Sequence, residues 1–286
     1  MNGILLVDKP QNWTSHDVVA KLRGVLHERR IGHSGTLDPL ATGLLVVFVG
    51  RATRAVQFAE ADSKTYMATM RLGVSTDTQD ISGSVIAESA HRPTDEEIEA
   101  VARRFTGDIK QVPPMYSAIK IGGKKLYEIA RRGETVEREP RDVRINSIDI
   151  ISRHGDEIEL KIDCSKGTYI RTLCSDMGDA LGCGACMSAL RRIRAGAFDI
   201  SNAHTMEQLA DIDTAEKFLL PVDTLFAAYP AFRVNAASAT RLKNGNELNL
   251  NTADGKYRIY SPSGEFLLLG DVKSGRLKTV KSFFEV

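Results

Sequence analysis

Apolar residues near the start of the chain follow two patterns that are typical of β-strands. Ile4–Val7 and Leu44–Val49 are unbroken apolar runs with the length of a short buried strand. Between Tyr66 and Leu72, apolar positions alternate with polar or small ones, as expected for a strand that is buried on one face. Isoleucines at 145–151 and apolar residues at 158–162 predict further strands.

Other stretches have the three-to-four-residue apolar spacing of helices. We predict a helix over about 16–28, with Ser15 as its N-cap and an apolar stripe that begins at Val18. The sequence Thr94–Glu97 is a capping box, which opens a helix that ends at about Phe105. Two more helices are expected, one over 52–61 and one from Thr168 or Tyr169 to about Leu181, ending at Gly182.

The composition changes at about 227–232. From there to the end, short apolar runs are separated by the turn signals Asn244-Gly245, Asp254-Gly255, Ser263-Gly264 and Ser274-Gly275. We therefore predict two domains, an α+β domain over 1–228 and a small all-β domain over 229–286.

Residues 113–140 differ in character from the rest of the first domain. They are rich in proline, glycine and basic residues, with Met115, Tyr116 and Tyr127 interleaved. This pattern predicts an inserted, mobile subelement. Aromatic rings among cations suit RNA, because bases stack on the rings while phosphates bind the cations.

Overall composition is that of an ordinary soluble protein. The chain has 286 residues, with 42% hydrophobic and 26% charged residues, and no apolar run approaches the length of a membrane span. No signal peptide is evident at the N-terminus, so we expect a cytoplasmic protein without a membrane association. The four cysteines are expected to be reduced. Cys183 and Cys186 have CxxC spacing, but one such pair without a further cluster is weak support for a metal site, and none is predicted.

The net charge of +1 hides an uneven distribution of charge. Basic residues concentrate at 110–132, at 190–198 and at 273–281, whereas acidic residues concentrate at 77–99 and 207–216. Such a chain can present a basic face to phosphates, although solvated helix and loop faces would give the same pattern.

One acidic residue, Asp38, stands alone between Glu28 and Glu60 in the stretch GHSGTLDPLATGLLVVFVG, residues 32–50. Pro39 restricts the backbone beside it, and the 44–49 strand follows directly. A constrained loop anchored to a core strand can aim one carboxylate at a substrate. Taken locally, the pattern favours the simpler interpretation, an ordinary loop in which Asp38 caps a turn. Asp77 and Asp80 in TDTQD do not have the spacing of an EF-hand and are interpreted as turn and capping residues.

The sequence GHSGTLDPLATGLL closely resembles the catalytic motif of the bacterial tRNA pseudouridine-55 synthases, the TruB family. Further stretches agree in the same order, across most of 1–225: LLVDKPQNWTSHDVV, KTY, RLGVSTDTQDISG, PPMYSAIKIGGKKLYEIARRG, CSKGTYIRTL and LRRIRAGAF. The resemblance implies the pseudouridine-synthase fold, a mixed and largely antiparallel sheet with peripheral helices. It also implies, more weakly, that residues 229–286 form a PUA-type RNA-binding domain.

The resemblance further implies isomerisation of uridine 55 in the T-loop of tRNA, with the target base flipped out of its stack. Asp38 would be the catalytic carboxylate, Arg171 its ion-pair partner, and Tyr66 the ring that stacks on uracil or moves a proton. A second set of residues is expected to bind substrate or support the binding loops: His33, Leu190, Lys9, Lys64, Tyr116, Lys120, Lys124, Lys125 and Arg191.

The reaction conserves atoms and transfers no electrons, so no cofactor is expected; the chain also lacks a G-x-G-x-x-G or Walker pattern. The expected partner is the T stem-loop of tRNA, with no obligatory protein partner and a monomeric state. Two other functions compete with this one. A non-enzymatic RNA-binding protein that helps tRNA fold would not require Asp38, Tyr66 and Arg171 together, although the two activities can coexist. A hydrolase acting on a nucleoside would need a second acid, which the motif around Asp38 does not supply.

Overall fold

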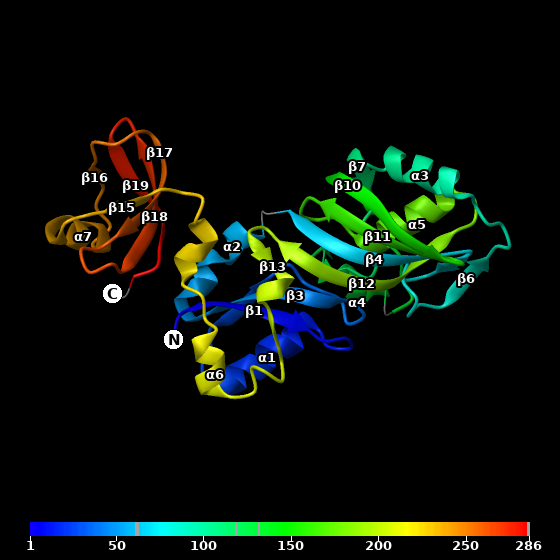
Figure 1. Cartoon of the computed structure of the whole chain (residues 1–286), viewed down its shortest axis with the longest axis horizontal. Helices are drawn as coiled ribbons and strands as arrows, with labels where there is room; N and C mark the ends of the chain where they lie inside the picture. Colours follow the sequence, from blue (N-terminus) through cyan, green and yellow to red (C-terminus); the bar gives the residue numbers. More distant parts are fainter. Residues whose placement is uncertain (61–62, 118, 131, 285–286) are drawn as a thin grey trace.

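The computed structural model describes residues 1–60, 63–117, 119–130 and 132–284. Its largest feature is a ten-stranded sheet. In Figure 1 this sheet occupies the middle and one end of the molecule, and a smaller C-terminal sheet stands at the other end.

The large sheet is mixed and largely antiparallel, as predicted. Among its neighbouring strands, β1 with β14 and β3 with β12 are parallel, and the remaining pairs are antiparallel. Its order is β14 (His204–Thr205), β1 (Gly3–Lys9), β3 (Thr42–Val49), β12 (Ala185–Ala195), β4 (Lys64–Leu72), β11 (Glu157–Cys164), β10 (Arg141–His154) and β7 (Gly107–Gln111), with β2 (Ile31–Ser34) on β3 and β13 (Phe198–Asp199) on β12.

Strand β3 is buried on both faces, which explains its unbroken apolar run. Leu45 and Val47 pack against helix α1 (Ser15–Leu26) in one hydrophobic cluster. Leu44 and Phe48 point the other way and pack in a second cluster with η1 (Gly50–Ala55) and α2 (Val56–Ala59). The helix predicted over 52–61 is therefore a 3-10 turn followed by one short α-helix, and residue 61 lies outside the described residues.

The prediction that Ser15 caps α1 is wrong. Thr14 is the N-cap: its hydroxyl accepts from the Asp17 amide at 3.0 Å, and Asp17 accepts from the Thr14 amide at 2.8 Å. Asp17 can close this capping box because its carboxylate reaches back as a Glu or Gln would. Ser15 is the first helical residue, and its hydroxyl is free for another partner.

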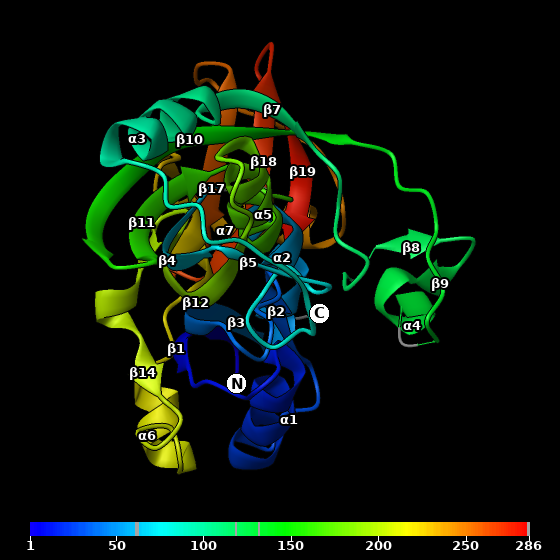
Figure 2. The ribbon, with the colours of Figure 1, turned by 90° about the vertical axis from the view of Figure 1, so that its right-hand side faces the viewer.

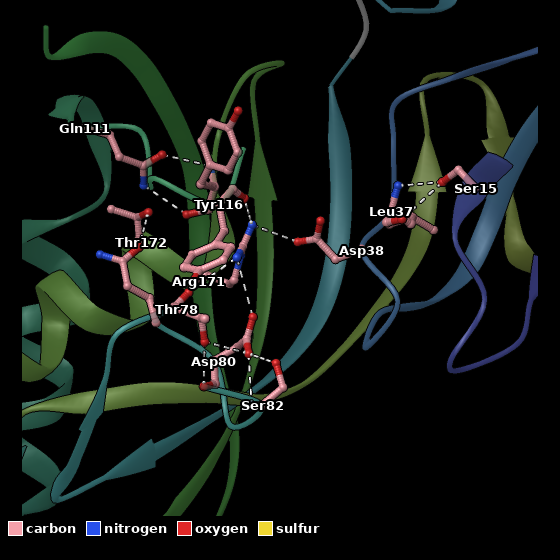
Figure 3. Close-up of polar contacts among 12 residues, drawn as sticks. Ser15, Leu37, Asp38, Thr78, Asp80, Ser82, Gln111, Tyr116, Arg171 and Thr172 are labelled. Atoms are coloured by element: carbon pink, nitrogen blue, oxygen red, sulfur yellow. Dashed lines mark hydrogen bonds and ion pairs between the residues drawn. The ribbon is translucent and has the colours of Figure 1, made fainter. Parts of the chain in front are cut away.

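Strand β4 shows the predicted alternation. Tyr66, Ala68, Met70 and Leu72 are buried on one face, under α5 (Ile170–Ala180) and α3 (Asp95–Arg104). The capping box predicted for α3 is present, with Thr94 as its N-cap. Helix α5 begins within one residue of its predicted start, and the side chain of its second residue, Arg171, points toward Asp38 (Figure 3).

The segment expected to be inserted carries β8 (Lys120–Ile121), β9 (Lys124–Lys125) and α4 (Leu126–Ala130). Figure 2 shows these three elements at the end of long connections, standing apart from the rest of the ribbon. The remaining elements of this part of the chain are the hairpin β5 (Val74–Thr76) and β6 (Val85–Glu88), then η2 (Ile200–Asn202), α6 (Ile212–Lys217) and η3 (Val222–Phe226).

The C-terminal sheet has the order β15 (Ala231–Arg233), β17 (Gly255–Tyr260), β18 (Phe266–Lys273), β19 (Arg276–Ser282) and β16 (Leu248–Asn249). The sheet was predicted, but helix α7 (Ala236–Lys243) was not, so this region is not purely β. Asn244-Gly245 ends that helix instead of joining two strands, with Gly245 at φ +80°. The proposed domain boundary between 228 and 229 stays a prediction.

The two sheets meet through aromatic side chains. Phe226 from η3 lies 5.3 Å from Phe58, 6.1 Å from Phe266 and 5.8 Å from Phe283, measured between ring centroids. Residues of both parts therefore belong to one buried cluster, with Ile4 on one side and Leu269 on the other.

Candidate active site

Asp38 lies on the loop that joins β2 to β3, and main-chain contacts hold its neighbours. The Asn12 amide donates to the Pro39 carbonyl at 2.8 Å, and the Ala41 amide donates to the Asp38 carbonyl at 3.1 Å. The Asp38 side chain is 41% exposed, whereas the adjacent Leu37 is buried. The loop therefore presents the Asp38 carboxylate to solvent while the side chain of Leu37 anchors it in the core.

Arg171, the second residue of α5, holds that carboxylate. Its Nη2 lies 3.0 Å from an Asp38 oxygen and also donates to the Tyr116 carbonyl at 2.8 Å. Its Nη1 donates to the Thr78 carbonyl at 3.3 Å. Only 6% of the Arg171 side chain is exposed, so this guanidinium is fixed in one orientation (Figure 3). The predicted pairing of Asp38 with Arg171 is thus present in the geometry.

A second carboxylate, Asp80, contacts the opposite side of the same guanidinium. An Asp80 oxygen lies 3.5 Å from Arg171 Nη1, and the Asp80 side chain is 7% exposed. Asp80 also accepts from the Thr78 hydroxyl at 3.0 Å and from both the amide and the hydroxyl of Ser82. The sequence pattern predicts only a turn residue at Asp80 and carries no sign of this ion pair. Asp77, its neighbour in sequence, does cap a turn by accepting from the Ser84 amide at 2.8 Å.

These contacts set the charge of Asp38. Burial raises its pKa above the ordinary carboxyl value; Arg171 and Lys9 oppose that rise, whereas the nearby Asp80 adds to it. Among the charged neighbours that lower the pKa of Asp38, the Arg171 guanidinium has the larger effect and Lys9 the smaller. Loss of Arg171 would remove both the contact that orients the Asp38 carboxylate and the charge that most lowers its pKa.

Tyr66 is buried in β4, and burial raises the pKa of its hydroxyl. Both Arg192 and Asp38 lie near enough to act on that pKa, Arg192 lowering it and Asp38 raising it. The raised pKa favours a protonated Tyr66 hydroxyl, and the role predicted for Tyr66 stays a prediction.

Arg192 was not among the residues predicted for the site, yet it is fully buried beneath it. Its Nε donates to the Leu44 carbonyl at 2.7 Å and its Nη2 to the Gly35 carbonyl at 2.9 Å. It thereby joins β12 to β3 and to the Asp38 loop. Gly35, at φ +69°, leaves room for it, since an added Cβ would lie 3.0 Å from Arg192 Nη1.

Two lysines that were predicted to face RNA or support a loop are buried. Lys9 has no exposed surface, and its ammonium donates to the carbonyls of Pro10 at 2.8 Å and Trp13 at 2.6 Å. Desolvation lowers the pKa of Lys9 to about 8. Lys64 is 7% exposed, and its ammonium donates to the Glu60 carbonyl at 3.4 Å. Both ammonium groups donate to main-chain carbonyls, which favours the loop-support role among the two left open for them.

Three other predicted residues lie on β2 and β12, two strands that both pair with β3. Leu190 on β12 is partly buried against the cluster that contains Tyr66. His33 on β2 is partly buried; burial lowers its pKa, and its Nδ1 is buried without a hydrogen-bond partner among the described residues. Arg191 is paired with Asp8 at 3.0 and 2.6 Å, and its side chain is 42% exposed.

The insertion contributes one contact to the site and several exposed cations. Tyr116 reaches Arg171 through its carbonyl. Lys120 and Lys124 are exposed on β8 and β9. The Lys125 side chain and Arg131, both counted in the predicted basic segment, lie outside the described residues.

No group of three or more His, Cys, Asp or Glu side chains suited to a metal ion occurs within the described ranges. Cys183 and Cys186 are free and buried, and burial raises the pKa of both thiols. Across the same ranges, no helix is long and apolar enough to cross a membrane.

Two family models match the chain in succession. Residues 23–170 match the N-terminal domain of the TruB family pseudouridylate synthases, and residues 171–227 match the C-terminal domain described for tRNA pseudouridylate synthase B. The boundary between the two falls just before Arg171, so the ion pair with Asp38 joins both.

Curated relatives match over nearly their whole length. The chain is 44% identical over 281 residues to the tRNA pseudouridine synthase B of Dechloromonas aromatica, covering 97% of this chain and 93% of that protein. It is 39% identical over 289 residues to the tRNA pseudouridine synthase B of Clostridium kluyveri, covering 99% and 100%.

Solved structures share the fold. A chain from a Cbf5-Nop10-Gar1 complex superposes with a TM-score of 0.75 and 26% identity, covering 99% of this chain and 85% of that one. A chain from an H/ACA RNP bound to a substrate RNA containing 2'-deoxyuridine gives the same TM-score at 24% identity, with the same coverage. The expected pseudouridine-synthase fold is thus confirmed.

Proposed function

The chain belongs to the TruB family of pseudouridylate synthases, and from this premise we propose that it isomerises uridine 55 in the T-loop of tRNA, with Asp38 as the catalytic carboxylate. It is accordingly a tRNA pseudouridine synthase, an isomerase. The reaction breaks the bond between N1 and C1′, turns the base, and joins C5 to C1′. A proton leaves C5 and N1 regains one, so the overall composition of the RNA is unchanged.

The observation that carries the proposal is the ion pair between Asp38 and Arg171. Arg171 is buried and fixed by two main-chain carbonyls, so it holds the Asp38 carboxylate in one direction while the side chain remains 41% exposed. A catalytic group must combine this fixed orientation with access to the substrate. Asp80 contacts the other side of Arg171 and is proposed to keep the guanidinium in place.

The target uridine must leave its stack to reach a carboxylate on this loop. Tyr66 supports that step, because its ring lies near Asp38 and Arg192 and can contact a flipped uracil while its hydroxyl serves a proton transfer at C5. Leu190, on the neighbouring strand, adds an apolar contact for the base. His33 is proposed to hold the RNA loop in its flipped form.

The exposed cations of the insertion, Lys120 and Lys124, are proposed to bind the T stem-loop by its phosphates, together with Lys125 and Arg191. Residues 229–286 are proposed to act as a PUA-type RNA-binding domain. We further propose that the protein works in the cytoplasm as a monomer, without a guide RNA or a protein partner, and that it also helps tRNA fold.

The deciding experiment compares Asp38→Asn with the wild type on a uridine-containing tRNA transcript, mapping pseudouridine by chemical labelling. Asparagine keeps the side-chain volume but removes the charge and the reactive oxygen. Product should fall to background over many enzyme equivalents, whereas filter binding of the same RNA should persist, because affinity comes from phosphate and stacking contacts elsewhere.

Asp77→Asn is the matched control, since it removes a carboxylate charge from the neighbouring turn whose side chain bonds the Ser84 amide and, among the described residues, is not paired with Arg171. Full turnover by Asp38→Asn would overturn the catalytic assignment. Loss of binding and turnover together would make Asp38 a structural residue of the loop and favour an RNA-binding role for the protein.

A further inference from the structure

The hydroxyl of Ser15 makes two buried hydrogen bonds to the residue before Asp38. It accepts from the Leu37 amide at 2.8 Å and donates to the Leu37 carbonyl at 3.1 Å, across 22 positions of sequence. Ser15 is 1% exposed and Leu37 is 3% exposed, so water cannot replace either bond (Figure 3). One side chain thus satisfies both main-chain groups of Leu37.

Leu37 needs such a partner because the loop has no strand pairing there. Strand β2 ends at Ser34 and β3 begins at Thr42, so a side chain must satisfy the main-chain groups of Leu37. On the other side of Asp38, the Pro39 carbonyl accepts from the Asn12 amide at 2.8 Å. Both residues that flank Asp38 are therefore tied to the same short segment, residues 12–15.

That segment is itself held from two directions. The Lys9 ammonium donates to the Pro10 and Trp13 carbonyls, and the capping box of Thr14 fixes the first turn of α1. Because Thr14 supplies the cap, the Ser15 hydroxyl is available to the Asp38 loop. The start of α1 thus acts as a fixed support for the loop.

We infer that Ser15 is a positioning residue for catalysis, which sets the place of Asp38 opposite Arg171 through its two hydrogen bonds to Leu37. The inference rests on the proposed catalytic role of Asp38. Asp38 and Arg171 approach from different elements, the β2–β3 loop and α5, and their 3.0 Å contact depends on where the loop is held. Without the hydroxyl, the Leu37 amide and carbonyl are buried and unpaired, and the loop must shift to satisfy them.

The test compares Ser15→Ala with Thr14→Ala in single-turnover pseudouridine formation at saturating tRNA. Both variants weaken the start of α1, but only the first removes hydrogen bonds to the Asp38 loop. A displacement of about 1 Å at a reacting group lowers the rate by roughly 100-fold, so Ser15→Ala should lose about 10- to 100-fold in turnover. Its KM and its dissociation constant for tRNA should match the wild type. Thr14→Ala should lose clearly less turnover than Ser15→Ala even where its unfolding midpoint falls as far, because the two bonds from Ser15 to Leu37 remain.

Equal turnover losses in the two variants would overturn the inference, because helix stability would then explain both. Normal turnover by Ser15→Ala would overturn it directly. If Ser15→Ala does not fold, Ser15→Cys provides the test, since a thiol is only a weak donor and acceptor. An intermediate turnover with unchanged KM supports the inference, and wild-type turnover overturns it. Absence of product from the wild-type protein would instead refute the proposed function.

Discussion

Replacing Arg171 with lysine tests the central ion pair without removing its charge. The guanidinium reaches Asp38 and Asp80 on two sides and two main-chain carbonyls between them. An ammonium concentrates its donors on one atom and cannot cover that span. We expect the lysine ammonium to pair with one of the two carboxylates. The other carboxylate, or the two carbonyls, would then lack a well-placed hydrogen-bond donor.

The magnitude follows from the hydrogen bonds that lysine cannot make. A hydrogen bond to a charged group is worth about 1.5–3 kcal/mol. If the transition state is without one such bond to Asp38, turnover falls by roughly 10- to 150-fold, because each 1.36 kcal/mol is a factor of ten. The fold should stay intact, since a positive charge still faces the two carboxylates.

The assay is single-turnover conversion of a T stem-loop RNA, with far-ultraviolet circular dichroism and a filter-binding titration on the same samples. Arg144→Lys is the matched control, because Arg144 also binds one carboxylate, Asp108, at 2.9 and 3.0 Å. That pair is on the surface, with side-chain exposures of 59% and 78%, and should contribute little to stability or turnover. Near-normal activity of Arg171→Lys would mean that charge alone suffices, or that Arg171 does not orient Asp38 in the working complex.

Four further outcomes are expected. Asp80→Asn should lower turnover in single-turnover assays without changing tRNA affinity, because Arg171 loses one of the two carboxylates that fix it; unchanged turnover would limit Asp80 to a structural role. In a pH–rate profile, turnover should fall on the acid side at a pH above the ordinary aspartate range, because the reactive ionised form of Asp38 is lost as the pH drops through its raised pKa. Asp80→Asn should move this acid limb to lower pH, because Asp80 raises the pKa of Asp38. Replacing Lys120 and Lys124 with alanine should weaken tRNA binding and reduce its log-log salt slope by roughly one unit for each phosphate that is no longer neutralised; an unchanged slope would show that β8 and β9 face away from RNA. Activity should survive exhaustive dialysis against a chelator, and a loss of turnover that zinc restores would contradict the expectation of a metal-free enzyme.

Sequence patterns predicted the parts of this molecule that depend on local information. The apolar run at 44–49, the alternation at 66–72 and the Thr94 capping box each became the expected element, because hydrophobic period and capping chemistry act within one element. Asp38 and Arg171 were identified as a pair only through long motifs that resemble a family. No local pattern in the chain relates two residues so far apart.

Predictions failed where tertiary contacts decided between similar residues. Thr14 and Ser15 are both competent N-caps, and the choice depends on which hydroxyl the Leu37 main chain takes. Asp77 and Asp80 are equivalent in sequence, yet only Asp80 reaches a buried guanidinium. Lysine is usually a surface residue, so the sequence gives no sign that Lys9 is buried. Its burial depends on the Pro10 and Trp13 carbonyls, which accept from its ammonium only in the folded loop.

The aromatic side chains packed between the two sheets fix the position of the C-terminal sheet relative to the large sheet. Phe226 packs against Phe266 and Phe283 of the C-terminal part as well as against Phe58 of its own part. A shared core therefore sets the separation between the Asp38 loop and the C-terminal sheet. An RNA that touches both places must match that separation, and a shorter RNA gains nothing from the second one. Truncation after residue 228 would remove the C-terminal side chains of this core. Phe58 and Phe226 would then form an exposed apolar patch that is prone to association.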